Sequence, residues 1–270
     1  MHSDQWDKFF DSFLDGDREP LSGFLVQQSP RLSNQNLTKL VENFPNLTEL
    51  RLSEIQKLDN ASLDLLHSLH NLTHLDLYRA GLTGENLTDE GVIPLIKAVG
   101  GKLHTLILSS NMNLTDGCLT QGVKSSCPNL RVLGLHELDL TPVGVKDLFE
   151  SWFENSGLEN LDLGGCIELD DEAIQAVVAH SGRELKDLNL HSVDAKLTEV
   201  GLKAVAAGCP ELRKLDLGFV RALDDFILVS EMVLLHSLCS YIIPITEGHP
   251  RQQSFTRKAQ HLCKSSRSRV

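Results

Sequence analysis

The sequence predicts an α/β fold, a right-handed solenoid with parallel strands on its concave face and helices on its convex face. Two observations carry this prediction. The pattern Leu-x-x-Leu-x-Leu occurs seven times, and its successive starts are 25, 31, 27, 28, 27 and 27 residues apart. A turn and a helix start follow each leucine triplet within the same unit. One short strand and one helix per unit can bury their leucines only by stacking on neighbouring units.

The seven copies predict seven short strands. The full copies begin at Leu47, Leu72, Leu103, Leu130, Leu158, Leu185 and Leu212. A degenerate eighth copy, Leu21-Phe24-Val26, starts 26 residues before the first full one. Because successive side chains of a strand point to opposite faces, the residues between the leucines should face away from the helices.

The helix starts read "LDNASL", "LTDEGV", "LTDGCL", "LTPVGV", "LDDEAI" and "LTEVGL". The Thr or Asp after the first leucine is a natural N-cap, since its side-chain oxygen can accept from unpaired amides of the first helical turn. Several helices should end before Pro45, Pro128 and Pro210, because proline disfavours a helical residue before it.

Three segments are expected. Residues 1–20 form an N-terminal helical cap, residues 21–230 the solenoid of about eight units, and residues 231–270 a divergent or disordered basic tail with six bases and no acid after Glu247. The helical pattern fails after "RALDDFIL". We expect that the natural coding sequence was interrupted near Val229 or Ser230; a divergent C-terminal cap is the alternative.

Composition excludes several classes of protein. The net charge is −12, so attraction of the whole molecule to phosphate backbones is not favoured. No apolar run approaches the roughly 20 residues of a membrane span, and the N-terminus lacks the apolar core of a signal peptide. The six cysteines form no Cys-x-x-Cys pair, which fits a reducing compartment.

Catalytic motifs are missing from the sequence. It contains no Gly-x-Ser-x-Gly, Gly-x-x-x-x-Gly-Lys-Ser/Thr or His-Glu-x-x-His. His67, His70 and His74 are close in sequence but are expected to be solvated at a helix–strand joint. Cys127 and Cys209 share one repeat position before proline and should be buried apolar residues rather than nucleophiles. We therefore expect no enzyme, no catalytic residue, no metal, no cofactor and no small-molecule substrate.

The concave face is the expected binding surface, because strand residues between the leucines are exposed there. This face is mixed with an acidic tendency, which favours a protein partner that presents Lys or Arg; a merely solvated face is the alternative for any single residue. The candidate protein-binding residues are Glu49, Arg51, His74, Asp76, Tyr78, His136, Asp162, Asp187, His191 and Asp216.

The 27-residue spacing and the "LTDxG" signature resemble the cysteine-containing class of leucine-rich repeats, found in substrate receptors of ubiquitin ligases. That class often has Cys or Asn three residues after the third leucine. Here Asn111 and Cys166 occupy that position, and apolar residues do so in the other units. The resemblance implies a horseshoe similar to that of ribonuclease inhibitor.

Longer strings resemble a narrower family. "WDKFFDSFL", "QSPRL", "LTDEGVIPLIKAVGGKLHTLILSSN", "AHSGREL" and "RKLDLGFVRALDDFILVSE" resemble the leucine-rich-repeat subunit of the fungal global-genome nucleotide-excision-repair complex, from about Gln5 to Glu231. The resemblance implies a nuclear, non-enzymatic DNA repair subunit. In that family the subunit pairs with a Snf-type DNA-dependent ATPase and is linked to a cullin-type ubiquitin ligase through an elongin-like adaptor.

The resemblance also leads to expectations about DNA contact and about an F-box. Contact with damaged DNA is expected to be indirect at most, and no membrane partner is expected. The family's longer N-terminal part does not precede Met1, so no F-box is expected in this chain. Two alternatives remain: the substrate-binding half of an F-box/leucine-rich-repeat (SCF-type) ubiquitin-ligase receptor, and a ribonuclease-inhibitor-like binder of a basic protein.

Overall fold

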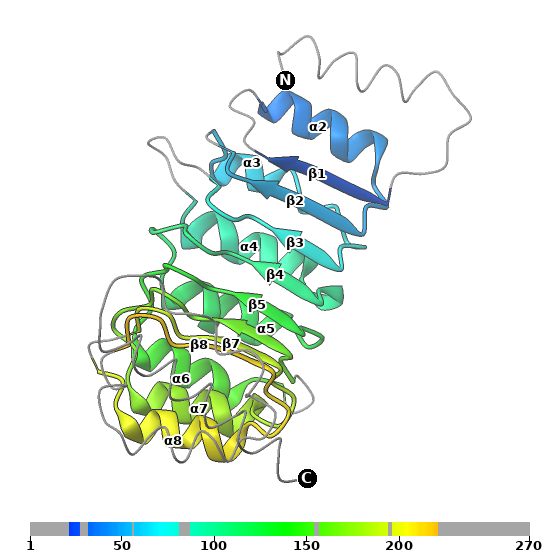
Figure 1. Cartoon of the computed structure of the whole chain (residues 1–270). Helices are drawn as coiled ribbons and strands as arrows, with labels where there is room; N and C mark the ends of the chain where they lie inside the picture. Colours follow the sequence, from blue (N-terminus) through cyan, green and yellow to red (C-terminus); the bar gives the residue numbers. More distant parts are fainter. Residues whose placement is uncertain are drawn as a thin grey trace, which may run out of the picture. The chain divides into compact units, whose positions relative to one another are not determined.

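The computed structural model describes residues 22–27, 32–55, 57–80, 87–153, 157–193 and 196–220 (Figure 1). The expected N-terminal cap, the expected interruption near Val229 and Ser230, and the expected basic tail lie outside the described residues. The chain divides into two units, Met1–Leu133 and Gly134–Val270, and each unit is described by itself.

The first unit contains a parallel sheet whose strands follow one another in chain order. Leu50 is paired with Leu75, and Leu75 with Leu106, so equivalent leucines of successive repeats lie side by side. Phe24 of the degenerate copy is paired with Leu50 in the same way, which confirms that this copy forms a strand. The strands are β1 (Gly23–Gln27), β2 (Glu49–Ser53), β3 (His74–Asp76) and β4 (Thr105–Ile107), and β5 (Val132–Gly134) begins at the end of the unit.

Helical segments of different kinds connect these strands. The segment Cys118–Val123 is π-helical, and the 3₁₀ turn Gly100–Lys102 follows α4 directly. The α-helices are α2 (Asn34–Asn43), α3 (Asn60–Asp64), α4 (Asp89–Val99) and α5 (Lys124–Ser126).

The second unit repeats the arrangement more regularly. Leu161, Leu188 and Leu215 are the paired central residues of three parallel strands, and three helices lie side by side on one face of that sheet (Figure 1). The strands are β6 (Asn160–Asp162), β7 (Asp187–Asn189) and β8 (Lys214–Asp216), and the helices are α6 (Pro142–Ser151), α7 (Asp171–Ser181) and α8 (Glu199–Gly208).

The leucines of the repeat form the core of each unit. All three leucines of every full copy are buried, from Leu47 to Leu217. Burying one such side chain contributes about 2–3 kcal/mol. Apart from Gly134, the strand residues between the second and third leucines are more exposed, which places them on the face of the sheet opposite the helices.

A hydrogen-bonded latch joins successive repeats at the helix starts. Asp171 accepts hydrogen bonds from the backbone N–H of Thr198 at 2.8 Å, from the hydroxyl of Thr198 at 2.5 Å and from the backbone N–H of Gly201 at 2.9 Å. In the first unit Asp89 accepts from the N–H and hydroxyl of Thr115. The Asp of "LTDxG" therefore binds the Thr of the next repeat.

The glycine of the same signature makes room for this latch. A Cβ at Gly201 would lie 2.6 Å from Asp171 Oδ1, and a Cβ at Gly117 would clash with the Asp89 carboxylate in the same way. Thr, Asp and Gly thus occupy fixed positions because one repeat's carboxylate is inserted against the next repeat's first helical turn.

The predicted N-caps are confirmed at four of the six helix starts. Asp59, Thr141, Asp170 and Thr198 each accept from a backbone N–H of the first turn. Thr88 occupies the N-cap position of α4 without a side-chain cap hydrogen bond, because its hydroxyl accepts from Asn60 Nδ2 of the preceding repeat at 2.8 Å. At the start "LTDGCL" the N-cap of the helical segment is Gly117, whose N–H donates to the hydroxyl of the predicted cap Thr115 at 3.3 Å.

Candidate functional site

In the first unit the predicted binding residues lie on β2 and β3 and on the turn after β3. Arg51 lies 3.6 Å from Glu49 on its own strand, and both side chains are about half exposed (48% and 45%). Asp76 has a structural role, because its carboxylate accepts hydrogen bonds from the backbone N–H of Tyr78 at 2.8 Å and from the Ser53 hydroxyl at 3.2 Å. The His74 ring lies 2.8 Å from the hydroxyl of Thr73.

In the second unit the predicted carboxylates likewise bond to the backbone. Asp162 accepts from the N–H of Gly164 at 3.0 Å, and Asp216 from the N–H of Gly218 at 2.9 Å. Asn189 makes the same bond to His191 in the repeat between them. These polar residues close the turn that follows each strand, as Asp and Asn side chains commonly do.

In the second unit, histidine and glycine alternate at the position after the third leucine of each repeat. A Cβ at Gly164 would lie 2.6 Å from His136 Nδ1, and a Cβ at Gly218 would lie 2.5 Å from His191 Cδ2. Each imidazole therefore lies over the glycine of the next repeat, which brings His136 Nδ1 within 3.6 Å of Asp162 Oδ1.

Electrostatics on this face are partly balanced. Burial raises the pKa of Asp162, although the Gly164 N–H and the neighbouring His136 act in the opposite direction. Asp187 lies 3.1 Å from Lys214 Nζ, so one predicted acid is paired within the surface. The predicted residues come together as two surfaces, one in each unit, rather than as an acidic cluster.

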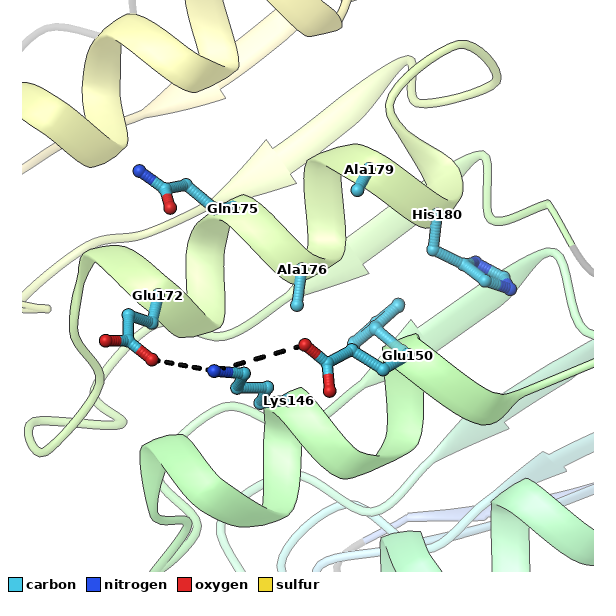
Figure 2. A pocket seen from close by; sticks show the side chains of 8 residues that line it. Lys146, Glu150, Glu172, Gln175, Ala176, Ala179 and His180 are labelled. Carbon is cyan, nitrogen blue, oxygen red and sulfur yellow. Dashed lines mark hydrogen bonds and ion pairs between the residues drawn. The ribbon is translucent and has the colours of Figure 1, made fainter.

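A groove on the helical side of the second unit was missed by sequence reasoning. It has a volume of about 590 Å³ and lies between α6 and α7 (Figure 2). Three small or aromatic residues line its apolar part: Phe149, Ala176 and Ala179. The available signal was the pair Ala176 and Ala179 on α7 together with Phe149 on α6, but no motif distinguishes these residues from ordinary helix residues.

Charged side chains line the rest of the groove. Lys146 Nζ lies 2.7 Å from Glu172 and 4.0 Å from Glu150, as Figure 2 shows. The hydrogen bond between Lys146 and Glu172 raises the pKa of the lysine and lowers that of the carboxyl. At the other end His180 stacks on Trp152 at 5.5 Å, and burial lowers the pKa of its imidazole.

The described residues include no group of three or more His, Cys, Asp or Glu side chains arranged to hold a metal ion. In the same part of the chain no helix is long and apolar enough to cross a membrane. Cys127 and Cys209 are buried, as predicted, and desolvation raises the pKa of each thiol to about 12. These thiols are therefore poor nucleophiles in the folded chain.

Comparison with known proteins gives the following relatives. No protein-family model matches the sequence. The chain is 31% identical over 226 residues to the DNA repair protein rhp7 of Schizosaccharomyces pombe, which covers 83% of this chain and 39% of rhp7. It is 30% identical over 234 residues to the DNA repair protein RAD7 of Saccharomyces cerevisiae, with 84% and 40% covered. The chain thus spans about two fifths of the length of these relatives.

Among solved structures the chain resembles Rad7 in the crystal structure of the yeast Rad7 and Elc1 complex. The TM-score is 0.75 and the identity 29%, and the match covers 87% of this chain and 58% of that one. The predicted α/β leucine-rich-repeat fold is confirmed by this likeness.

Proposed function

Because this chain belongs with the Rad7 and rhp7 DNA repair proteins over its repeat region, we propose that it is the repeat portion of a DNA-damage-recognition subunit. In this role it is a non-enzymatic scaffold of nucleotide excision repair and acts in the nucleus. The observation that carries the proposal is the likeness to rhp7 over 83% of the chain, together with the TM-score of 0.75 to Rad7.

The proposed partners are proteins. Rad7 forms a complex with Elc1, which supports an elongin-like adaptor as one partner of this chain and a link to a cullin-type ubiquitin ligase. The family resemblance implies a Snf-type ATPase as a second partner. The net charge of −12 supports a role in which damaged DNA is reached through a partner rather than by the repeats themselves.

The proposed partner-binding surface is the strand face of each unit. The side chains whose substitution tests this surface most directly are those of Arg51, which is about half exposed, and of Tyr78. His136 and His191 are the candidates of the second unit. Asp76, Asp162 and Asp216 are weaker candidates, because substitution would also remove the hydrogen bond that each accepts from a backbone N–H of the following turn.

Affinity purification of the tagged full chain from its native nuclear extract, read by mass spectrometry, tests the proposal. Recovery of the Snf-type ATPase supports it. Recovery of adaptor and cullin without the ATPase would favour the ubiquitin-ligase-receptor alternative, and recovery of neither would reject the repair assignment.

A matched pair of variants then tests the surface. Arg51→Ala with Tyr78→Ala changes the strand face of the first unit and should reduce recovery of the partner. Lys203→Ala on α8 changes an exposed pair with Glu199 on the helical side and should not. Equal recovery with both variants would remove the strand face from the proposal.

A further inference from the structure

The groove between α6 and α7 combines an apolar floor with a charged rim. Phe149 is 2% exposed and Ala176 8%, so they form its base, while Ala179 and Gln175 lie at its open side. A volume of about 590 Å³ falls within the range of ligand pockets. An apolar floor with a charged rim suits a long side chain that has an apolar stem and a charged end.

The two carboxylates of the groove differ in how closely they approach Lys146. Lys146 is drawn to Glu172, at 2.7 Å, and lies 4.0 Å from Glu150. Figure 2 shows Glu150 on α6 and Glu172 on α7, with Lys146 between the two carboxylates. Glu150 thus retains most of its capacity to accept hydrogen bonds. It also lies in the last turn of α6, where the carbonyl ends of the helix favour a cation.

Lys146 is the only lining side chain of the groove that carries a positive charge near Glu150. His180 is the remaining basic side chain of the lining, and its ring is packed against Trp152 and against Phe149 at 5.7 Å. Burial lowers the pKa of His180, so the imidazole is neutral at neutral pH. The end of the groove near Glu150 is consequently negative and bordered by apolar atoms.

We propose that this groove is a docking point for an arginine side chain of a partner protein. The aliphatic stem lies along Ala176 and Ala179, and the guanidinium binds the Glu150 carboxylate through paired N–H groups. Arginine fits better than lysine because its planar fork can bind a carboxylate in a bidentate manner while its weaker hydration lowers the cost of entering the apolar groove. The site rests on the proposed function only in that the partner is a protein.

Amide NMR titration of the full chain tests this proposal with three probes. N-acetyl-arginine amide should produce saturable shifts at α6 and α7, centred on Phe149 and Ala179. N-acetyl-citrulline amide, which has the same shape without the charge, should bind at least about tenfold more weakly, because a hydrogen bond to a charged group is lost. N-acetyl-lysine amide should bind more weakly than the arginine probe. Equal binding of either control probe would overturn the proposal.

Three variants separate the groove from general attraction to an acidic protein. Glu150→Gln should weaken the arginine probe about tenfold, and Ala179→Leu should block it by filling the groove. Glu211→Gln removes the same charge from an exposed position outside the groove and should leave binding unchanged. Equal loss with Glu150→Gln and Glu211→Gln, or shifts spread over all the acidic residues, would show non-specific attraction and overturn the proposal. This readout is independent of whether the repair partners are recovered.

Discussion

Substituting Gly201 by alanine should destabilise the second unit, although alanine is the better helix former. The added Cβ would lie 2.6 Å from Asp171 Oδ1 and 2.6 Å from Leu197 Cδ1. The substitution would therefore displace the carboxylate that accepts from the Gly201 and Thr198 N–H groups.

The magnitude follows from three effects. Overpacking of this kind costs about 1–3 kcal/mol, and the weakening of the hydrogen bonds to this partly exposed carboxylate costs about 0.5–1.5 kcal/mol. The gain in helix propensity is at most about 1 kcal/mol, and smaller in the first turn where Gly201 lies. We expect a net loss of about 2 kcal/mol, or about 4–8 °C in the melting temperature.

Gly101→Ala is the matched control, because nothing lies within 4 Å of a Cβ at that position. Its unfolding free energy, measured by urea titration with circular dichroism, should stay within about 0.5 kcal/mol of the parent chain. Asp171→Ala should cost about 1–2 kcal/mol through the lost latch.

The double variant Asp171→Ala with Gly201→Ala isolates the contact. Removing the carboxylate removes most of the clash, so the double variant should be less destabilised than the sum of the single variants by about 1–2 kcal/mol. Additive single-variant effects, or equal stability of Gly201→Ala and Gly101→Ala, would refute the latch as the reason for the glycine.

Three further outcomes are expected. Asn111→Ala should cost about 2–4 kcal/mol in urea unfolding, because the buried amide donates to two core carbonyl groups, those of Leu77 at 2.9 Å and Leu108 at 2.7 Å. Burial raises the pKa of Asp162, so near this pKa the folded state binds more protons than the unfolded state. The free energy of unfolding therefore falls as the pH rises above the ordinary value of 3.8. Asp162→Asn should flatten this fall, measured as the melting temperature against pH, and should raise the stability at pH 7. Peptide mapping after maleimide treatment of the folded chain should find the buried thiols unlabelled, and labelling without denaturant would contradict their burial; these are Cys118, Cys127, Cys166 and Cys209.

The leucine period was sufficient to predict the strands and their pairing. A strand residue that is buried in one repeat must lie beside the equivalent residue of the next, so spacing alone places Leu50 beside Leu75. Even the degenerate copy could be identified, because Phe24 and Val26 keep the alternation with exposed Leu25. Here local pattern and tertiary packing impose the same requirement.

Other features depend on contacts that no period encodes. The sequence "CLTQGV" has an ordinary helical pattern, yet Cys118–Val123 is π-helical, while Gly122 packs against Ile96 of the preceding helix. The groove beside Glu150 likewise results from how α6 and α7 lie together. Such features depend on side chains from neighbouring repeats, whose relative placement is set by packing.

Many charged side chains of the second unit form ion pairs between neighbouring repeats, which the net charge of the chain does not reveal. Lysines bridge neighbouring repeats, as in the pairs Lys186–Glu159 at 2.6 Å and Lys196–Glu168 at 2.7 Å. Each exposed pair is worth about 0–1 kcal/mol, so the pairs align the repeats more than they stabilise them. A carboxylate that already binds a lysine or a backbone N–H has less remaining capacity to bind a basic side chain of a partner. The acidic tendency of the strand face therefore overstates its attraction for basic ligands. A carboxylate with only one distant cation, such as Glu150, is a better guide to where a basic side chain binds.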